Sequence, residues 1–200
     1  MKKVLLLMCD GTEMLEAASF YDVLGWSGSA GFEHVEVITA GSNSPIVCTF
    51  GMKVIPDILF SEINIEDYDA LAIPGGFDEF NFYDDAFSTT VSKLIKCFHE
   101  LRKPIASICV GALPVANAGI LKDKKATTYH LMGGRRRRQL AEYGVNVIDA
   151  MIVSDGNIIT STSPASAPEV ALLLLEKLTG TDTANQVREL MGYKTEMKIV

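Results

Sequence analysis

One stretch decides the fold of this chain: Pro104-Ile105-Ala106-Ser107-Ile108-Cys109-Val110-Gly111-Ala112-Leu113-Pro114. It begins as an apolar strand and turns abruptly into a helix, with a cysteine at the corner. The small residues Ser107 and Gly111 flank Cys109 in a small-x-nucleophile-x-small pattern, which allows a tight strand-to-helix turn, the nucleophile elbow. We therefore expect Cys109 at the N-terminus of a helix, whose partial positive charge favours a thiolate over a thiol.

Hydrophobic patterning around this stretch predicts the rest of the fold. Apolar runs bounded by turn residues are typical of strands buried on both faces, as in parallel sheets, and most of them are followed by segments with helical spacing. Such alternation predicts an α/β fold, a mostly parallel sheet with helices on both faces. We expect strands near 4–9, 34–39, 69–73, 104–108, 126–128, 145–148, 152–153 and 158–160, and an edge hairpin at 46–48 and 52–55. We expect helices near 14–26, 86–101, 113–118, 130–143, 166–178 and 184–191.

Length and charge restrict the classes of function. The 200 residues, 48% of them apolar, suit a single domain over 1–200, with 181–200 as a C-terminal helical extension. A formal charge of −7 argues against nucleic-acid binding, which needs a surplus of Lys and Arg. The run of four arginines at 135–138 is therefore interpreted as a solvated helix face or part of a dimer contact.

Cysteine spacing and hydropathy indicate the compartment. The four cysteines show neither CxxC nor Cys/His ligand spacing, which argues against a structural zinc site. No apolar run reaches the length of a membrane span, and the N-terminal run is too short for a signal sequence. We expect a cytoplasmic protein with reduced thiols and no membrane partner.

Three stretches follow predicted strands and carry chemistry: Asp10 to Glu16, Pro74-Gly75-Gly76, and Cys109. Because active sites of such sheets lie at the carboxyl ends of the strands, we expect the three stretches to meet in one site. The aromatic segment 77–85 is expected mainly to pack the rim of that site.

Each candidate has a second interpretation. Cys109 could be an inert buried thiol, although the elbow argues against it, and Cys9 is a secondary candidate because it ends the first strand. Glu16 could simply favour a helix N-terminus, or it could be a protonated acid that hydrogen-bonds a thiolate and passes protons. Gly75 and Gly76 could form a tight turn or donate amides to an oxyanion.

Tyr129 and His130 compete for a third catalytic position. A histidine here could activate the thiol, as in Cys-His pairs, or it could start a helix without a chemical role. The residues themselves do not decide between these positions.

Together these motifs resemble the DJ-1/PfpI superfamily, also called ThiJ/PfpI, within the class I glutamine amidotransferase-like fold. The resemblance spans about 3–180, and its order of motifs is specific. The stretches that carry it are Asp10-Gly11-Thr12-Glu13-Met14-Leu15-Glu16, Ile73-Pro74-Gly75-Gly76, Ser107-Ile108-Cys109-Val110-Gly111-Ala112, Lys125-Ala126-Thr127-Thr128-Tyr129-His130 and Asp155-Gly156-Asn157-Ile158-Ile159-Thr160-Ser161.

The resemblance implies a flavodoxin-like three-layer sandwich, usually a homodimer, without a metal or organic cofactor. It implies that Cys109 is the reactive thiol and Glu16 its hydrogen-bonding acid, with the amides of Gly75, Gly76 and Val110 around the oxyanion position.

Departures from the family pattern indicate the branch. Members of the intracellular-protease type have a histidine directly after the cysteine, where this chain has Val110, and this argues against peptidase activity. The isocyanide-hydratase type has an aspartate where this chain has Glu16 and a threonine in place of Val110. The deglycase and glyoxalase branch matches Glu16, but its histidine aligns nearer Tyr129 than His130.

We therefore expect a cysteine-dependent enzyme, a hydrolase or lyase, acting on a small-molecule electrophile such as a carbonyl, amide or isocyanide. The alternative is an oxidative-stress sensor in which Cys109 is oxidised to a stabilised sulfinate without turnover. A ligand-binding regulatory domain is a third hypothesis.

Overall fold

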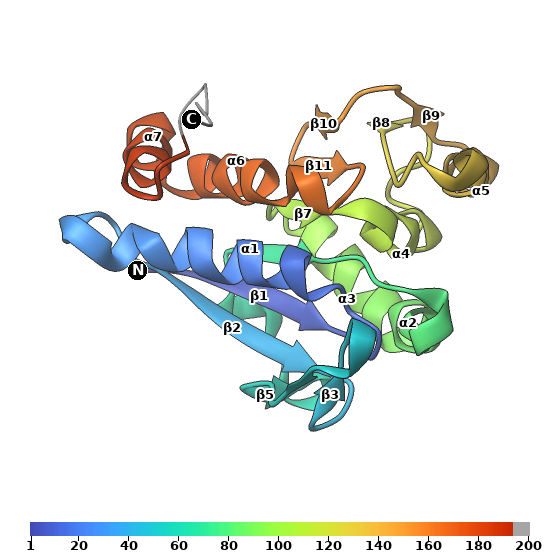
Figure 1. The fold of residues 1–200 in the computed structure, drawn as a ribbon, viewed down its shortest axis with the longest axis horizontal. Coiled ribbons are helices and arrows are strands. Elements are labelled where there is room, and N and C mark those ends of the chain that lie inside the picture. The colour runs from blue at the N-terminus through green and yellow to red at the C-terminus, as the bar shows by residue number, and fades with distance from the viewer. Residues whose placement is uncertain (194–200) are drawn as a thin grey trace, which may run out of the picture.

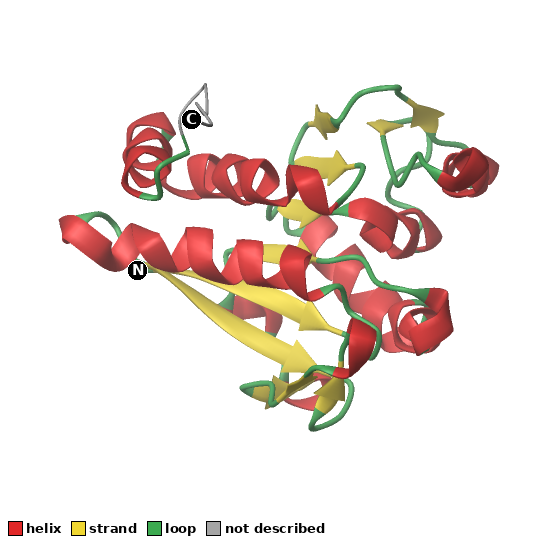
Figure 2. Ribbon diagram, in the orientation of Figure 1, coloured by secondary structure: helices red, strands yellow, loops and turns green. Residues whose placement is uncertain are grey.

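A twisted, mostly parallel sheet forms the centre of the molecule in the computed structural model, which describes residues 1–193 (Figures 1 and 2). Its seven strands lie in the order β10-β11-β7-β6-β1-β2-β5, and every pair is parallel except β10 with β11. The strands are β1 (Lys2–Met8), β2 (Val35–Gly41), β5 (Ile58–Leu59), β6 (Ala70–Ile73), β7 (Ile105–Ser107), β10 (Ile152–Asp155) and β11 (Ile158–Ser161).

Helices cover both faces of this sheet, which confirms the predicted three-layer, flavodoxin-like α/β fold (Figure 2). One face carries α1 (Met14–Gly25) and α6 (Ala167–Thr179), with α7 (Thr181–Leu190) packed on α6. The other face carries α2 (Phe82–Ala86), α3 (Thr89–Glu100) and α4 (Ala112–Asn117), with α5 (Arg135–Glu142) packed beside α4.

Alternation along β1 explains the two cores. Val4 and Leu6 point into the core beneath α1 and α6, whereas Leu5 and Leu7 point into the core beneath α3. All four side chains are at most 2% exposed. A strand buried on both faces must be apolar throughout, so the continuous apolar run in the sequence follows directly from its central place in the sheet.

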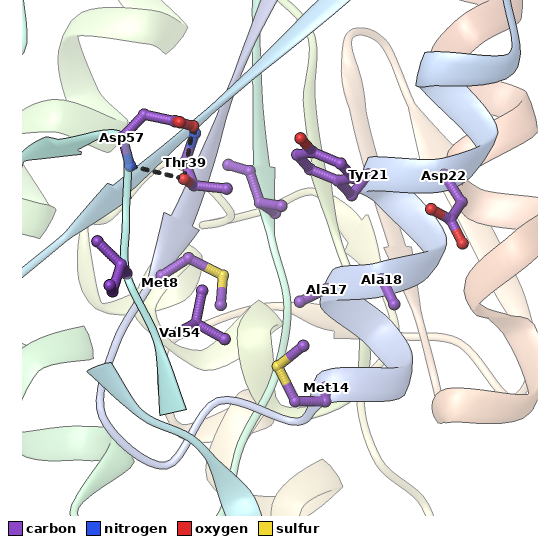
Figure 3. A pocket seen from close by; sticks show the side chains of 11 residues that line it. Met8, Met14, Ala17, Ala18, Tyr21, Asp22, Thr39, Val54 and Asp57 are labelled. Carbon is purple, nitrogen blue, oxygen red and sulfur yellow. Dashed lines mark hydrogen bonds between the residues drawn. The ribbon is translucent and has the colours of Figure 1, made fainter. Parts of the chain in front are cut away.

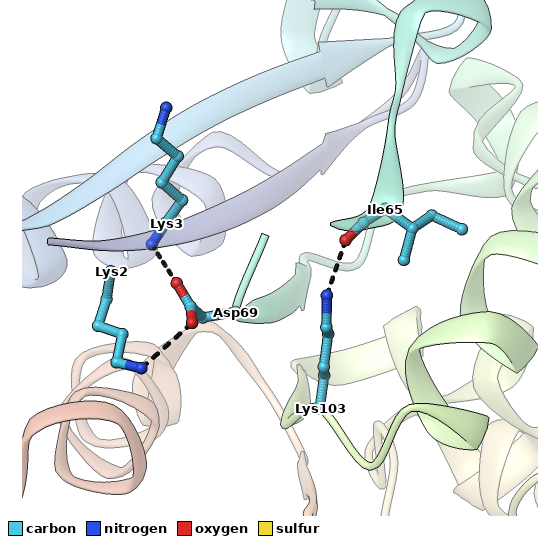
Figure 4. A network of polar contacts seen from close by, with 5 residues as sticks. All are labelled: Lys2, Lys3, Ile65, Asp69 and Lys103. Carbon is cyan, nitrogen blue, oxygen red and sulfur yellow. Dashed lines mark hydrogen bonds and ion pairs between the residues drawn. The ribbon is translucent and has the colours of Figure 1, made fainter. Parts of the chain in front are cut away.

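Polar contacts hold the amino ends of the strands (Figure 4). The Asp69 carboxylate accepts hydrogen bonds from Lys2 Nζ at 3.2 Å and from the Lys3 amide at 2.9 Å, which joins the start of β1 to the start of β6. Nearby, Lys103 Nζ donates to the Ile65 carbonyl at 2.8 Å. These contacts lie at the edge opposite the carboxyl ends, so they serve the fold rather than the site.

Two small sheets stand apart from the large one. The expected hairpin forms an antiparallel pair of β3 (Ile46–Val47) and β4 (Lys53–Val54). The strands β8 (Lys125–Ala126) and β9 (Asn146–Val147) pair in parallel.

Three predicted helix boundaries were wrong. The helix expected from residue 86 begins at Thr89, because the Ser88 side chain accepts a hydrogen bond from the Val91 amide and caps α3 there. The helix expected from about residue 130 begins at Arg135, because Gly133 and Gly134 adopt positive φ angles of 73° and 70° that interrupt a helix. The last helix begins at Thr181 rather than at residue 184, because Gly180, at φ 93°, ends α6 and lets the chain turn at once. The rest of the predicted extension, from residue 194 onward, lies outside the described residues.

Within residues 1–193, no helix combines the length and the apolar character needed to cross a membrane.

Candidate active site

Cys109 stands at a strained corner between β7 and α4. Its φ angle is 56°, in the left-handed region that residues other than glycine seldom adopt. A Cβ on Gly111 would lie 2.6 Å from the Ile73 carbonyl oxygen and 2.9 Å from that of Pro74. The turn therefore presses against the end of β6 so closely that only glycine fits, which is the physical reason for the small residue two places after the cysteine.

A hydrogen bond holds this corner: Thr128 Oγ1 donates to the Cys109 carbonyl oxygen at 2.8 Å. This bond attaches the segment after β8 to the elbow. Cys109 itself is half-buried.

Glu16 lies in the first turn of α1 and is fully buried. Its Oε2 accepts a hydrogen bond from the Gly75 amide at 2.6 Å, and its Oε1 has no hydrogen-bond partner among the described residues. A Cβ on Gly75 would lie 2.9 Å from Glu16 Oε2 and 3.0 Å from Cys109 Cβ. Gly75 is therefore wedged between the acid and the thiol, and the three predicted stretches do meet.

Burial sets the protonation of this pair. It raises the pKa of Glu16 from 4.5 to about 8, although the Gly75 hydrogen bond opposes the rise. Burial, followed by the negative charge of Glu16, also raises the pKa of the Cys109 thiol well above its usual value. At neutral pH the acid therefore holds its proton, as expected for a carboxyl in an apolar site.

The expected low pKa of Cys109 was wrong. The Val110 amide at the helix start does lower the pKa of the thiol, in the predicted direction. Burial and the Glu16 charge outweigh that contribution, because a partial charge at the end of a short helix is a smaller effect than removal from water. The thiolate therefore needs a base to form.

The predicted oxyanion donors divide into two groups. Gly75 is engaged by Glu16, so its amide positions the acid and is not a free donor, contrary to the expectation. Gly76 pairs with Thr12 in an antiparallel bridge that joins the β6 end to the β1 end. A Cβ on Gly76 would come within 2.3 Å of the Phe82 ring, so this glycine also permits close packing. The amides of Gly76 and Val110 remain predicted oxyanion donors.

Tyr129 and His130 lie in the loop between β8 and α5, and both are half-buried. Their ring centroids are 6.4 Å apart, and His130 Nδ1 is buried without a hydrogen-bond partner among residues 1–193. In that same part of the chain, no hydrogen bond joins either ring to Cys109 or Glu16. Their catalytic roles stay predictions.

Cys9, the secondary candidate, is 3% exposed. Burial first, and then the charges of Asp85 and Asp10, raise the pKa of its thiol well above the usual value. A buried thiol beside carboxylates is a poor nucleophile, so the inert interpretation fits Cys9.

The sequence placed Tyr83 in the aromatic segment expected at the rim of the site, but it did not predict the partner of its ring, Arg136. Tyr83 of α2 has a buried hydroxyl without a partner among the described residues, and the Arg136 guanidinium of α5 lies 4.8 Å from its ring centroid. The arginine run was interpreted as a solvated helix face or part of a dimer contact, yet the Arg136 side chain is only 15% exposed. Which arginine of a helical run points inward depends on where the helix begins, and that start was misplaced by about five residues.

A groove of about 280 Å³ lies elsewhere, between α1 and the β4 segment (Figure 3). Met14, Ala17 and Tyr21 line it from α1, and Val54 lines it from β4. Ile55, which follows β4, also lines it. None of its lining residues is a predicted site residue.

Comparisons with known proteins agree with this geometry. Residues 2–177 match the DJ-1/PfpI family. The chain is 30% identical to protein DJ-1 homolog B of Arabidopsis thaliana over 92% of its own length, but spans only 40% of that relative. It is 29% identical to protein dj-1beta of Drosophila melanogaster, covering 93% of this chain and 94% of the relative.

Solved structures give the same result. The crystal structure of Drosophila melanogaster DJ-1beta aligns with a TM-score of 0.83 and 27% identity, covering 95% of this chain and 97% of that one. Oxidised Toxoplasma gondii DJ-1 aligns with a TM-score of 0.81 and 28% identity, covering 96% and 98%.

Proposed function

Because the chain belongs to the DJ-1/PfpI family, we propose that it is an enzyme in which Cys109 attacks a small electrophile: a carbonyl, an amide or an isocyanide. The observation that carries this proposal is the wedge of Gly75 between a fully buried acid and a strained thiol. Membership in a family does not by itself define the reaction, so the activity must be inferred from the residues of the site. A buried acid beside a thiol suits proton transfer to and from sulfur.

In the first step, Glu16 acts as a base toward Cys109 and then as an acid toward the product of the attack. An ionised Glu16 takes the thiol proton while Cys109 Sγ forms a bond to the electrophilic carbon, and the π electrons move to the attached oxygen or nitrogen. The amides of Val110 and Gly76 stabilise that anion, and Glu16 then returns the proton to it. A pKa of about 8 suits both tasks, because about a tenth of Glu16 is ionised at neutral pH.

The substrate is a small molecule rather than a peptide. Val110 occupies the position after the nucleophile, where peptidase-type members have a histidine. Tyr129 and His130 are proposed to serve as additional proton donors at the site mouth, and no cofactor is required by the step described.

A panel of methylglyoxal, simple amides and an isocyanide tests this function. We expect turnover of at least one of these compounds, and loss of that turnover in Cys109→Ser, because the alcohol of serine is a far weaker nucleophile without a matched base. Cys97→Ser is the matched control, because Cys97 is a half-buried cysteine on α3 outside the site. Full activity in Cys109→Ser would overturn the mechanism.

A second candidate function is a peroxide sensor. Glu16 is protonated at neutral pH and its Oε1 has no partner among residues 1–193, so it is free to donate a hydrogen bond to an oxygen on Cys109. A relative has been crystallised in an oxidised form. Intact mass after mild peroxide treatment separates the candidates: a gain of two oxygens on Cys109, with no turnover in the panel, would favour the sensor.

We also propose a cytoplasmic homodimer. All four cysteines are free, which suits a reducing compartment. Tyr21 and Ile55, which line the groove between α1 and the β4 segment, are 51% and 79% exposed. A second copy bound at this face would cover them, and large exposed apolar patches commonly mark interfaces.

A further inference from the structure

Tyr83 carries a polar atom that the fold leaves unsatisfied. Its ring stacks on Phe87 with centroids 4.9 Å apart, and its hydroxyl is buried without a hydrogen-bond partner among the described residues. A buried hydroxyl without a partner is unfavourable, because it has lost its hydrogen bonds to water and gained none in return. A ligand that accepts a hydrogen bond from this hydroxyl would satisfy it.

Arg136 completes a polar pair with Tyr83. Its guanidinium covers the Tyr83 ring at 4.8 Å, and Arg136 Nη1 donates to Gln139 Oε1 at 3.0 Å. The only carboxylate paired with it among residues 1–193 is that of Asp78, whose Oδ2 lies 3.7 Å from Arg136 Nη2. This ion pair is long, and the Asp78 side chain is 51% exposed. A better oriented anion can therefore displace Asp78 from Arg136 easily.

Tyr83 follows a loop that packs against the site. The loop that leads to Tyr83 packs against the site glycines, because a Cβ on Gly11 would lie 2.5 Å from the Phe80 carbonyl oxygen and one on Gly76 would meet the Phe82 ring. In Figure 1, α2 lies just beyond the arrowheads of β1 and β2 and α5 lies on the same side of the molecule.

The charges around Tyr83 agree with that placement. Burial raises the pKa of the Tyr83 hydroxyl, the Arg136 charge lowers it, and a negative charge on Cys109 raises it. Tyr83 therefore lies within electrostatic reach of both the guanidinium and the sulfur.

We propose that Arg136 and the Tyr83 hydroxyl form a subsite for a carboxylate carried by the electrophile that Cys109 attacks. This subsite rests on the proposed function and deepens it, since it selects carbonyl compounds that bear an acid group over neutral ones. A guanidinium binds a carboxylate through two parallel hydrogen bonds, and the phenol adds a third donor. One guanidinium balances the single charge of a carboxylate, whereas a phosphate dianion beside Asp78 would leave excess negative charge.

Asp78 pairs with Arg136 while no ligand is bound. An incoming carboxylate replaces this carboxylate on Arg136, and because Asp78 is half in water its release costs little. Removal of the Asp78 charge should therefore strengthen the preference for anions, and removal of the Arg136 charge should weaken it.

Two alkylating reagents test the subsite directly. Iodoacetate and iodoacetamide both form an S–C bond at Cys109 and release iodide, but only iodoacetate carries a carboxylate. The rate at Cys109 is measured for each reagent by mass spectrometry of its peptide, and the ratio of the two rates is divided by the same ratio for free glutathione. Changes in thiolate fraction cancel in this ratio because both reagents meet the same thiol.

We expect Arg136→Met to lower the iodoacetate-to-iodoacetamide ratio about tenfold, and Tyr83→Phe to lower it about threefold. Arg138→Met is the matched control, because Arg138 lies on the same helix but bonds the exposed Gly133 carbonyl. It should change the ratio less than twofold. Asp78→Asn should raise the ratio, whereas the neighbouring and exposed Glu79→Gln should not.

The outcomes are distinguishable. Normal iodoacetamide reactivity with an unchanged ratio in Arg136→Met and Asp78→Asn would overturn the subsite alone. A Cys109 that reacts with neither reagent in the folded wild-type protein would overturn both the subsite and the proposed nucleophile. Equal effects of Arg136→Met and Arg138→Met would also overturn the subsite, because they would indicate a general loss of positive charge.

Discussion

At the scale of single residues, Glu16 shows how burial creates chemistry. Its carboxyl is 0% exposed, with one oxygen bonded to the Gly75 amide and the other unpaired within residues 1–193. A carboxyl removed from water keeps its proton, so the pKa rises to about 8, with burial as the largest cause and the negative charge of Glu13 as a smaller one. The same burial must reduce the stability of the protein as the pH rises.

The stability of the wild-type protein should therefore fall relative to Glu16→Gln between about pH 5 and pH 8. The unfolded chain loses the Glu16 proton near 4.5 and the folded protein loses it near 8, so the contribution is fully present at low pH and is lost as the pH rises through this window. At about 1.4 kcal/mol per pH unit, the difference should reach roughly 3 to 5 kcal/mol.

Urea unfolding of both proteins across this pH range measures that difference. Glutamine keeps the oxygen that accepts from Gly75, so the comparison isolates the ionisation. Parallel stability curves for the two proteins would show that Glu16 is not a buried, neutral acid.

Within the site, the placement of some residues was predictable from the sequence and that of others was not. The strained corner at Cys109 and the nearby Glu16 follow from small residues and strand ends, which local patterns encode. The use of the Gly75 amide by Glu16 does not, because a hydrogen bond between residues 59 positions apart depends on how two strand ends are placed. The contact of Arg136 with Tyr83 was not predicted for a similar reason, since the inward direction of the Arg136 side chain depends on the exact start of α5.

At the scale of elements, the turn from β7 into α4 depends on close backbone contact. Gly111 has an ordinary helical φ of −59°, so its requirement for glycine is purely steric. The carbonyl oxygens of Ile73 and Pro74 occupy the space where a Cβ would stand. Backbone at the end of a buried strand cannot move aside as a flexible side chain would.

Gly111→Ala should accordingly destabilise the protein by about 1–3 kcal/mol, the usual cost of overpacking, and slow alkylation of Cys109. Gly25→Ala is a matched control, because Gly25 also has a helical φ of −62° and a Cβ there would meet nothing within 4 Å. Thermal unfolding of both variants checks this. A stability loss in Gly25→Ala equal to that in Gly111→Ala would point to helix propensity rather than to the predicted clash.

Most elements were predictable because the sheet is buried on both faces. Continuous apolar runs predicted β1 and β6 and helical spacing predicted α1, α3 and α6, since tertiary burial and local pattern agree there. The errors fall at helix starts: at α3, which Ser88 caps, and at α5 and α7, which follow positive-φ glycines. A glycine permits such an angle without requiring it, so its position alone did not mark the boundary.

At the scale of the whole molecule, different side chains of α1 serve different purposes. Glu16, in the first turn, lies in the site, whereas Met14 and Tyr21 line the groove. A dimer through this face would therefore place a second copy close to the helix that carries the acid.

We expect a solution mass near twice 21.7 kDa by light scattering, and a shift toward the monomer in Ile55→Glu. A charge at this 79% exposed position would have to lose water on burial in the interface. Met151→Glu, at a 60% exposed position before β10, is the control that should remain dimeric. A monomeric wild-type protein, or dissociation of both variants alike, would refute this arrangement.

The coupling of Glu16 to Cys109 is tested most directly by the rate of Cys109 alkylation with iodoacetamide as a function of pH. In the wild-type protein we predict an inflection near pH 8, where Glu16 becomes ionised and begins to accept the thiol proton. Glu16→Gln should lose that inflection and show a single ionisation at lower pH than the wild-type thiol, because the negative charge that raises the pKa of Cys109 is gone. Superimposable profiles for the two proteins would contradict a coupled acid and thiol at this site.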